Sequence, residues 1–184
     1  MSEQNLNEQN VQPAAEDMDA LRQVRFDKLT EMQENGNDPF VITKFDVTAS
    51  TAECRSMYEA EEAKLPADLD DEAKKAAYDA LNEKFTVTIA GRIMSWRKMG
   101  KANFLDLRDR SGRLQVYVRM NDIGEDAFTA FRKWDIGDIM GVTGTLFRTR
   151  TGELSVHATA VTLLSKSLNT RKRRSTRNRF FFRR

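Results

Sequence analysis

Alternation of apolar and polar residues, which begins at Phe85, constrains the fold of this chain more than any other feature of its sequence. Apolar side chains occupy every second position in residues 85–89, 105–107 and 114–118. Because neighbouring side chains of a strand point to opposite faces, this spacing predicts three strands that each bury one face. Gly91 interrupts the first strand and predicts a bulge, where the strand bends as a barrel requires.

The segments that follow complete a small barrel. The DRSG turn at residues 109–112 predicts a hairpin of the second and third strands. A helix is expected over 125–134, with three aromatic residues on the side that closes one end of a barrel. Two more strands are expected over 138–148 and 153–163. Three strands, a helix and two strands within about 80 residues is the order of a five-stranded OB-fold barrel, which is used to bind oligonucleotides.

Residues ahead of the barrel have the pattern of a helical arm. Apolar spacing predicts a first helix over 15–35, and Gly36 stands where a C-terminal cap belongs. Two acidic helices are expected over 51–64 and 70–84, separated by Pro66. We interpret the arm as solvated and amphipathic. The apolar stripe of its first helix consists of Met18, Leu21, Val24, Leu29 and Met32.

Four segments result from this division. Residues 1–14 are too polar to offset the cost of ordering and are expected to be disordered. The helical arm covers 15–84, and the barrel covers 85–168. A basic tail over 169–184 is also expected to be disordered. The fold class is therefore α+β and mainly β, an OB-fold barrel preceded by an N-terminal helical arm.

Charge is divided unevenly along the chain. The first 84 residues contain 20 acidic and 9 basic side chains, residues 85–170 contain 8 and 13, and the last 14 contain 8 basic side chains and no acidic ones. This division favours an anionic partner for the barrel or the tail. One cysteine and one histidine leave no internal disulfide and no Cys/His metal cluster. With no signal peptide and no membrane span in the sequence, we expect a cytoplasmic protein.

The alternation also predicts which side chains face outward. If Leu105 is in the core, Phe104 faces out. If the turn is the two-residue loop of Arg110 and Ser111, Phe104 lies opposite Tyr117 and diagonal to Gln115. A ring beside an amide can stack on a base and hydrogen-bond its edge, as in the recognition of single-stranded RNA. The alternative is that Phe104 packs under the N-terminal helix.

Cations accompany this ring. Arg97, Lys98 and Lys101 surround Gly100 in the turn that follows the first strand, where they are suited to contact phosphates or bases. A merely solvated loop is the alternative. On the last strand, Glu153 and two further side chains, Ser155 and His157, are expected to face outward.

Glu153 and His157 each have two interpretations. Composition favours Glu153 as a simple turn residue over an acceptor for base N–H groups. His157 has no metal-ligating or nucleophilic partner in the sequence, so we expect a plain surface histidine. No phosphate-binding glycine loop and no nucleophile motif is found, and no catalytic residue is predicted.

Together these residues resemble the N-terminal region of class II bacterial lysyl-tRNA synthetases. The resemblance covers most of residues 20–168 and rests on LRQVRFDKLTEMQENGNDPF, ITKFDVT, VTIAGRIMSWRKMGKANFLDLRD, GRLQVYV, KWDIGDIMGVTGTLFRTRTGELSVHA and TLLSKSL. Aspartyl- and asparaginyl-tRNA synthetases carry a related barrel, but MGKA, KWDIGD and RTRTGELS are more similar to the lysyl enzymes.

The resemblance implies roles for individual residues. It implies that Phe104 stacks on an anticodon base, that Arg97 and Gln115 contact anticodon bases, and that Glu153 accepts a hydrogen bond from the first of them. For Glu153 it therefore replaces the interpretation that composition favours. Lys101 and Tyr117 complete the set of expected RNA-binding residues.

The partner implied is the anticodon stem-loop of lysine tRNA, and no membrane is implied. The resemblance also allows a homodimer of the full-length enzyme. In that family a catalytic domain follows the barrel and joins lysine to tRNA with ATP and magnesium. Here the chain continues from Leu168 as NTRKRRSTRNRFFFRR, which does not resemble the family's linker. We interpret this ending as an out-of-frame or prematurely stopped terminus, and expect no cofactor and no activity from the chain alone. The segment 61–84 is longer than the family's usual connection into the first strand of the barrel, and the sequence offers no functional explanation for it.

Two rival functions are left open. The chain could be a free-standing OB-fold protein that binds single strands without sequence preference, which predicts equal affinity for unrelated oligonucleotides. It could also be an assembly module that docks on another synthetase subunit through its acidic helices.

Overall fold

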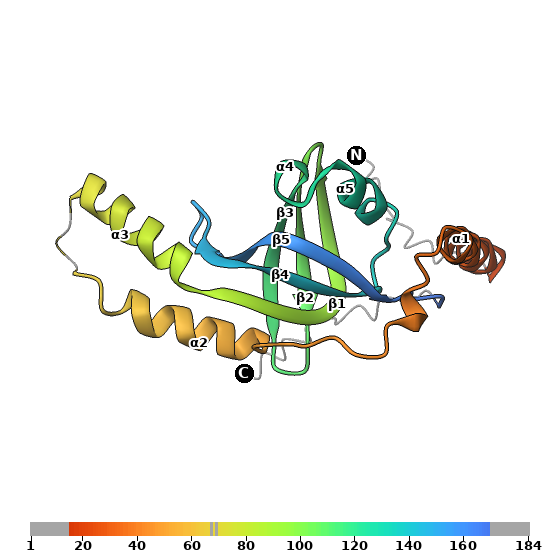
Figure 1. The fold of residues 1–184 in the computed structure, drawn as a ribbon, viewed down its shortest axis with the longest axis horizontal. Coiled ribbons are helices and arrows are strands. Elements are labelled where there is room, and N and C mark those ends of the chain that lie inside the picture. The colour runs from red at the N-terminus through yellow and green to blue at the C-terminus, as the bar shows by residue number, and fades with distance from the viewer. Residues whose placement is uncertain (1–14, 67, 69, 170–184) are drawn as a thin grey trace, which may run out of the picture.

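The computed structural model describes residues 15–66, 68 and 70–169, in which five strands and their helices follow the order expected from the sequence (Figure 1). The segments 1–14 and 170–184, for which disorder was predicted, lie outside the described residues. The elements are α1 (Ala15–Glu34), the 3-10 helix η1 (Pro39–Val41), α2 (Thr51–Glu62), α3 (Asp71–Lys84), β1 (Thr86–Met99), β2 (Ala102–Arg108), β3 (Arg113–Arg119), α4 (Met120–Ile123), α5 (Glu125–Phe131), β4 (Ile139–Arg148) and β5 (Leu154–Ser165).

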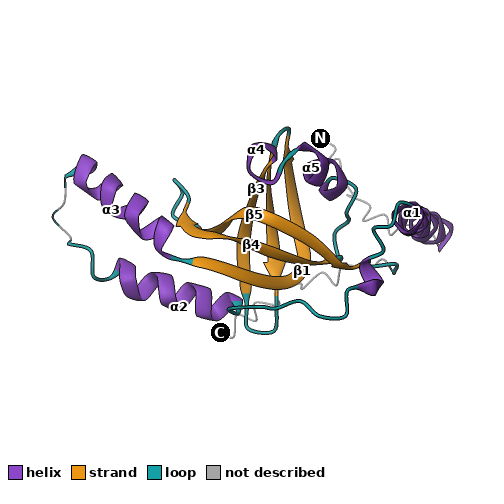
Figure 2. Cartoon of the chain, viewed as in Figure 1, coloured by secondary structure: helices purple, strands orange, loops and turns teal. Residues whose placement is uncertain are grey.

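The five strands form a closed barrel in the order β1-β2-β3-β5-β4, which confirms the OB-fold (Figure 2). All neighbouring strands are antiparallel except β3 and β5, which run parallel and close the barrel. The predicted inward side chains are buried, among them Leu105, Leu107 and Val116. Within the described residues, no helix is both long and apolar enough to cross a membrane.

Helix α5 closes one end of the barrel, as the aromatic spacing predicts. Phe128 and Phe131 are buried, and the Phe131 ring lies 4.5 Å from that of Trp96 on β1, measured between centroids. Trp134, just after the helix, contacts Phe131 edge to face at 5.3 Å. This aromatic cluster joins the helix to the barrel core.

The bulge is not at Gly91, so that prediction is wrong in its position. The register of β1 against β2 shifts between Ile93 and Ser95 instead. At Gly91 a side chain is excluded for another reason, because a Cβ atom there would lie 2.9 Å from the carbonyl oxygen of Arg108. The glycine permits a close approach of two strands, and the bend follows two residues later.

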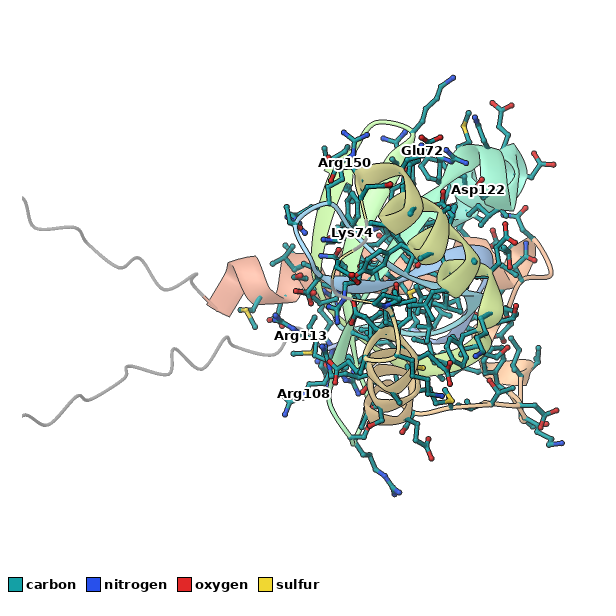
Figure 3. All side chains as sticks on the ribbon, turned by 90° about the vertical axis from the view of Figure 1, so that its left-hand side faces the viewer. Glu72, Lys74, Arg108, Arg113, Asp122 and Arg150 are labelled. Atoms are coloured by element: carbon teal, nitrogen blue, oxygen red, sulfur yellow. The ribbon has the colours of Figure 1, made fainter. Side chains whose placement is uncertain are left out.

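The predicted apolar stripe of α1 is buried only in its second half. Leu29 is buried and Met32 packs against the core, whereas Leu21 and Val24 are each 50% exposed. The first half of the helix extends beyond the barrel, so no surface is available there to cover it (Figure 3). The cap at Gly36 is confirmed, with a φ of 71°.

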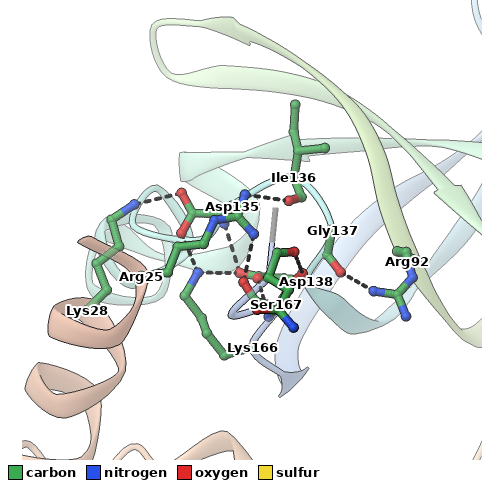
Figure 4. Close-up of polar contacts among 10 residues, drawn as sticks. Arg25, Lys28, Arg92, Asp135, Ile136, Gly137, Asp138, Lys166 and Ser167 are labelled. Carbon is green, nitrogen blue, oxygen red and sulfur yellow. Dashed lines mark hydrogen bonds and ion pairs between the residues drawn. The ribbon is translucent and has the colours of Figure 1, made fainter. Parts of the chain in front are cut away.

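Polar contacts attach α1 to the barrel (Figure 4). The fully buried Lys166 contacts the carboxylates of Asp135 and Asp138, the latter at 2.8 Å. From α1, Lys28 reaches Asp135 at 2.7 Å, and Arg25 donates to the carbonyl of Ile136. Burial by itself raises the pKa of Asp135, but the two lysines outweigh it and lower that pKa.

The arm formed by α2 and α3 is anchored to the barrel, in contrast to the solvated arm expected. Its two helices lie side by side (Figure 1), and Tyr58 of α2 donates a hydrogen bond of 2.8 Å to Asn82 of α3. Cys54, Tyr58 and Leu81 are buried in the same apolar cluster as the barrel core. A capping box of Ser50 and Glu53 begins α2.

One carboxylate joins this arm to the β2–β3 hairpin. Asp109 accepts from the backbone N–H groups of Ser111 and Gly112 at 2.7 and 2.8 Å, which closes the turn. It also accepts from the N–H and the hydroxyl of Thr51, the first residue of α2, both at 2.7 Å. Burial by itself raises the pKa of Asp109, but these hydrogen bonds outweigh it and hold that pKa well below its usual range.

Asp109→Ala should therefore lower the free energy of unfolding by about 3 kcal/mol, since a turn and a helix start lose their acceptor together. Because the pKa is lowered by folding, this contribution is fully present above the ordinary aspartate pKa, about 3.9, and declines below it. Urea unfolding at several pH values measures both effects. Asp46→Ala is the control, because Asp46 is exposed and, among the described residues, is paired only with Lys44. Equal losses in the two variants would contradict this role.

Candidate nucleic-acid interface

A stacked pair of rings lies on the outer face of the β2–β3 hairpin. Phe104 pairs with Tyr117 across the strands, as the two-residue turn predicts. The ring centroids are 4.7 Å apart with planes inclined by 29°. Both side chains are half-buried, so each keeps part of its surface accessible. The alternative in which Phe104 packs under the N-terminal helix is not found, because its described ring contacts are with Tyr117 and Arg97.

Cations flank this pair. Arg97 stands opposite Phe104 in the register of β1 and β2, with its guanidinium carbon 5.6 Å from the ring centroid. Arg97 is exposed, as is Lys101 in the turn at Gly100, whose φ is 59°. Lys98 instead lies over Trp96, 4.7 Å from its ring. Arg97 and Lys101 therefore present positive charge beside the half-buried ring of Phe104.

Gln115 lies on the predicted face but is buried, only 8% exposed, which corrects the expectation of a solvent-facing amide. Ser155, also expected outside, is completely buried. The parallel pairing of β3 with β5 sets these two residues side by side, and the Ser155 hydroxyl donates to Gln115 Oε1 at 3.0 Å. This bond orients the amide, and no described residue accepts from Gln115 Nε2. The Nε2 group is therefore the donor available to a ligand.

Glu153 is exposed at the end of the β4–β5 turn, as predicted. Its backbone N–H donates to Thr149 Oγ1 and its carbonyl accepts from the Thr149 N–H, both at 3.0 Å. The Ser155 hydroxyl, whose one hydrogen goes to Gln115, lies 3.4 Å from the same carbonyl. Its carboxylate has no partner among the described residues. Ser155 therefore lies between the backbone of Glu153 and the amide of Gln115.

Two further rings extend this surface and were not predicted as part of it. The ring of His157 on β5 lies 5.3 Å from that of Tyr117 and 5.8 Å from that of Phe147 on β4. His157 is not the plain surface histidine expected, because its Nε2 lies 2.6 Å from an oxygen of Asp122. Hydrogen bonding by Arg119, followed by that of His157, lowers the pKa of Asp122 despite partial burial.

Arginines continue the outer face toward the hairpin turn. Arg108 and Arg113 pair across β2 and β3. Each lies four residues from the ring on its own strand, and Arg113 lies two residues from Gln115, so alternation places them on the same face. Figure 3 places both, with Arg150 of the β4–β5 turn, on one side of the molecule, and Asp122 on the other. Arg113 is partly offset by Asp106 at 3.6 Å. The described residues contain no group of three His, Cys, Asp or Glu side chains arranged to hold a metal ion.

An aromatic surface with flanking cations on a five-stranded barrel defines a nucleic-acid-binding module. Residues 87–164 match the tRNA anticodon-binding family, described as an OB-fold nucleic acid binding domain, and this part of the chain is such a domain. Over 88% of its length, the chain matches the N-terminal region of lysine–tRNA ligases.

Relatives from three clostridia illustrate this similarity. The chain is 41% identical over 162 residues to the lysine–tRNA ligase of Clostridium botulinum strain Hall and 38% identical over 161 residues to that of Clostridium tetani, in each case covering 88% of this chain and 28% of the relative. The enzyme of Clostridium novyi is 40% identical over 152 residues, which is 83% of this chain and 26% of the relative. The chain therefore spans little more than a quarter of the length of these curated relatives.

Phe104 and Leu105 are neighbours on opposite faces of β2, so we expect their replacement by alanine to lower stability by different amounts. Leu105→Ala removes a fully buried side chain and should lower the free energy of unfolding by about 2 to 5 kcal/mol. Phe104→Ala removes a half-buried ring from the outer face and should cost about 1 kcal/mol, mainly its contact with Tyr117. Urea unfolding followed by circular dichroism measures both. A larger loss in Phe104→Ala than in Leu105→Ala would contradict the assigned faces.

Proposed function

We propose that this chain binds the anticodon stem-loop of lysine tRNA on the outer face of β2, β3 and β5. The observation that carries this proposal is the accessible Phe104 ring, backed by Tyr117 and flanked by Arg97. Stacking of one base on such a ring contributes about 1 to 3 kcal/mol. The match of residues 87–164 to an anticodon-binding family and the similarity to lysine–tRNA ligases support the choice of RNA.

The polar groups around the ring suit a uridine. A uracil base presents carbonyl acceptors and one ring N–H donor on its pairing edge. Gln115 Nε2 supplies a donor whose direction is set by the bond from Ser155, and this suits a carbonyl. The free carboxylate of Glu153 can accept from a ring N–H of a neighbouring base, for which we propose the first anticodon position. Lys101 would then neutralise a phosphate.

We further propose that the chain contributes RNA binding to the reaction of a lysine–tRNA ligase and performs no chemistry by itself. In that proposal, ATP, magnesium and lysine bind in the part of the relatives that this chain does not match, and a homodimer belongs to the full-length enzyme. Its location would be the cytoplasm, with tRNA as the partner and no membrane attachment.

Fluorescence anisotropy with labelled RNA stem-loops tests the function. One stem-loop carries the lysine anticodon, and a second differs from it only in the anticodon. The full chain should bind the first more tightly at two salt concentrations, and a chain ending at residue 169 should keep the same preference. Removing residues 170–184 controls for their eight basic side chains, which bind any polyanion in a salt-sensitive way. Equal affinities would favour a protein without sequence preference.

Substitutions on the surface should separate the contribution of base stacking to RNA affinity from that of charge. Phe104→Ala should weaken binding of the lysine stem-loop by about tenfold or more, because a stacking platform is lost. Gln115→Ala should reduce the preference for the lysine anticodon. Lys101→Ala should weaken all RNAs alike and reduce the salt slope by about 1.

A matched control is available in Phe40→Ala. Phe40 is an exposed phenylalanine in η1, beside α1 and away from the β2–β3 hairpin (Figure 1). Its removal should leave the affinity unchanged. A loss in Phe40→Ala as large as that in Phe104→Ala would contradict the proposed surface.

A further inference from the structure

The C-terminal end of α2 is linked to the turn between β4 and β5, which carries Glu153. Arg148, the last residue of β4, donates from Nε to Glu62 Oε1 at 2.5 Å, and its second terminal nitrogen pairs with Glu62 Oε2. Glu62 is the last residue of α2. The side chains of Arg148 and Glu62 are 24% and 18% exposed, so water competes little for this bidentate pair.

The same arginine holds the turn. Its remaining terminal nitrogen donates to the carbonyl oxygen of Gly152 at 2.8 Å. Gly152 has a φ of 81°, and its N–H donates to the carbonyl of Thr149 at 2.9 Å. Glu153 follows directly, with its N–H on Thr149 Oγ1. One guanidinium therefore joins the end of α2 to the residue that precedes Glu153.

Both helices of the arm hold this pair in place. Tyr78 of α3 donates to Glu62 Oε1 at 3.1 Å. The Arg148 guanidinium also lies over the buried ring of Tyr58, 5.7 Å from its centroid. The hydrogen bonds from Arg148 are the largest influence on the Glu62 carboxylate and lower its pKa, so the pair is ionised at neutral pH.

We propose that Glu62 is a positioning residue for Glu153. Through Arg148 it fixes the β4–β5 turn, so that the Glu153 carboxylate stands beside Gln115 and can discriminate the first anticodon base. This inference rests on the proposed function and assigns the acidic arm a role in specificity. Glu62 touches no RNA itself.

Glu61 provides a matched control for Glu62. It is the neighbouring glutamate on α2 and is also doubly paired, with Lys64 at 2.5 Å and Lys84 at 2.7 Å. These partners lower its pKa to about 2, but both belong to the arm and neither touches the turn. Glu61→Gln thus removes an equivalent charge without changing any described contact of Arg148.

Two readouts on the full chain test the proposal. The first is amide hydrogen exchange at Gly152 and Glu153, which should accelerate about tenfold in Glu62→Gln, as the turn opens more often, and stay unchanged in Glu61→Gln. The second is the ratio of affinities for stem-loops with uridine or cytidine at the first anticodon position. Glu62→Gln should reduce this ratio by about tenfold, close to the effect of Glu153→Gln, because one base contact is lost.

Arg148→Lys is a second variant, which keeps one charge pair but loses the bidentate geometry, and it should fall between the parent chain and Glu62→Gln in both readouts. Parent-like exchange and ratio in both Glu62→Gln and Arg148→Lys would overturn the proposal, as would an equal weakening of every RNA. If the parent chain itself shows no preference for the lysine anticodon, the proposed function fails as well. A preference that persists in Glu62→Gln removes only the positioning role.

Discussion

The Asp109 carboxylate is the interaction on which the rest of the structure depends. It accepts five hydrogen bonds, three from the turn and two from the first residue of α2, and so sets the β2–β3 register and the position of the arm together. A slip of one residue in that register would turn Leu105 outward and Phe104 inward. The proposed binding surface and the hydrophobic core therefore both depend on a single turn.

In the proposed function, selectivity comes from Gln115, a residue that is largely covered. Gln115 is oriented by Ser155 on the neighbouring strand, and this bond leaves one amide donor directed to a ligand. A freely rotating glutamine would offer donor and acceptor alike. Burial thus turns a general polar group into a donor, while Phe104, which is more exposed, is proposed to supply affinity without strong preference among bases.

The arm formed by α2 and α3 is attached to the barrel at two points. Asp109 holds the beginning of α2 on the β2–β3 turn, and Arg148 holds its end at Glu62 on the β4–β5 turn. The same helix therefore joins the two turns whose strands carry the rings, the amide and the Glu153 carboxylate. Because both ends of α2 are attached to the barrel, the inner face of the arm is buried with the barrel core.

Local patterns in the sequence determined the helices, the strands and the faces of the strands, because alternation and turn chemistry act between near neighbours. They placed Phe104 opposite Tyr117 correctly. Only the tertiary structure decided which strands meet. The parallel pairing of β3 with β5 joins residues about 40 positions apart, and it alone buries Gln115 against Ser155 and sets His157 beside Tyr117. No local pattern specifies such a register, because it follows from the closure of the whole barrel.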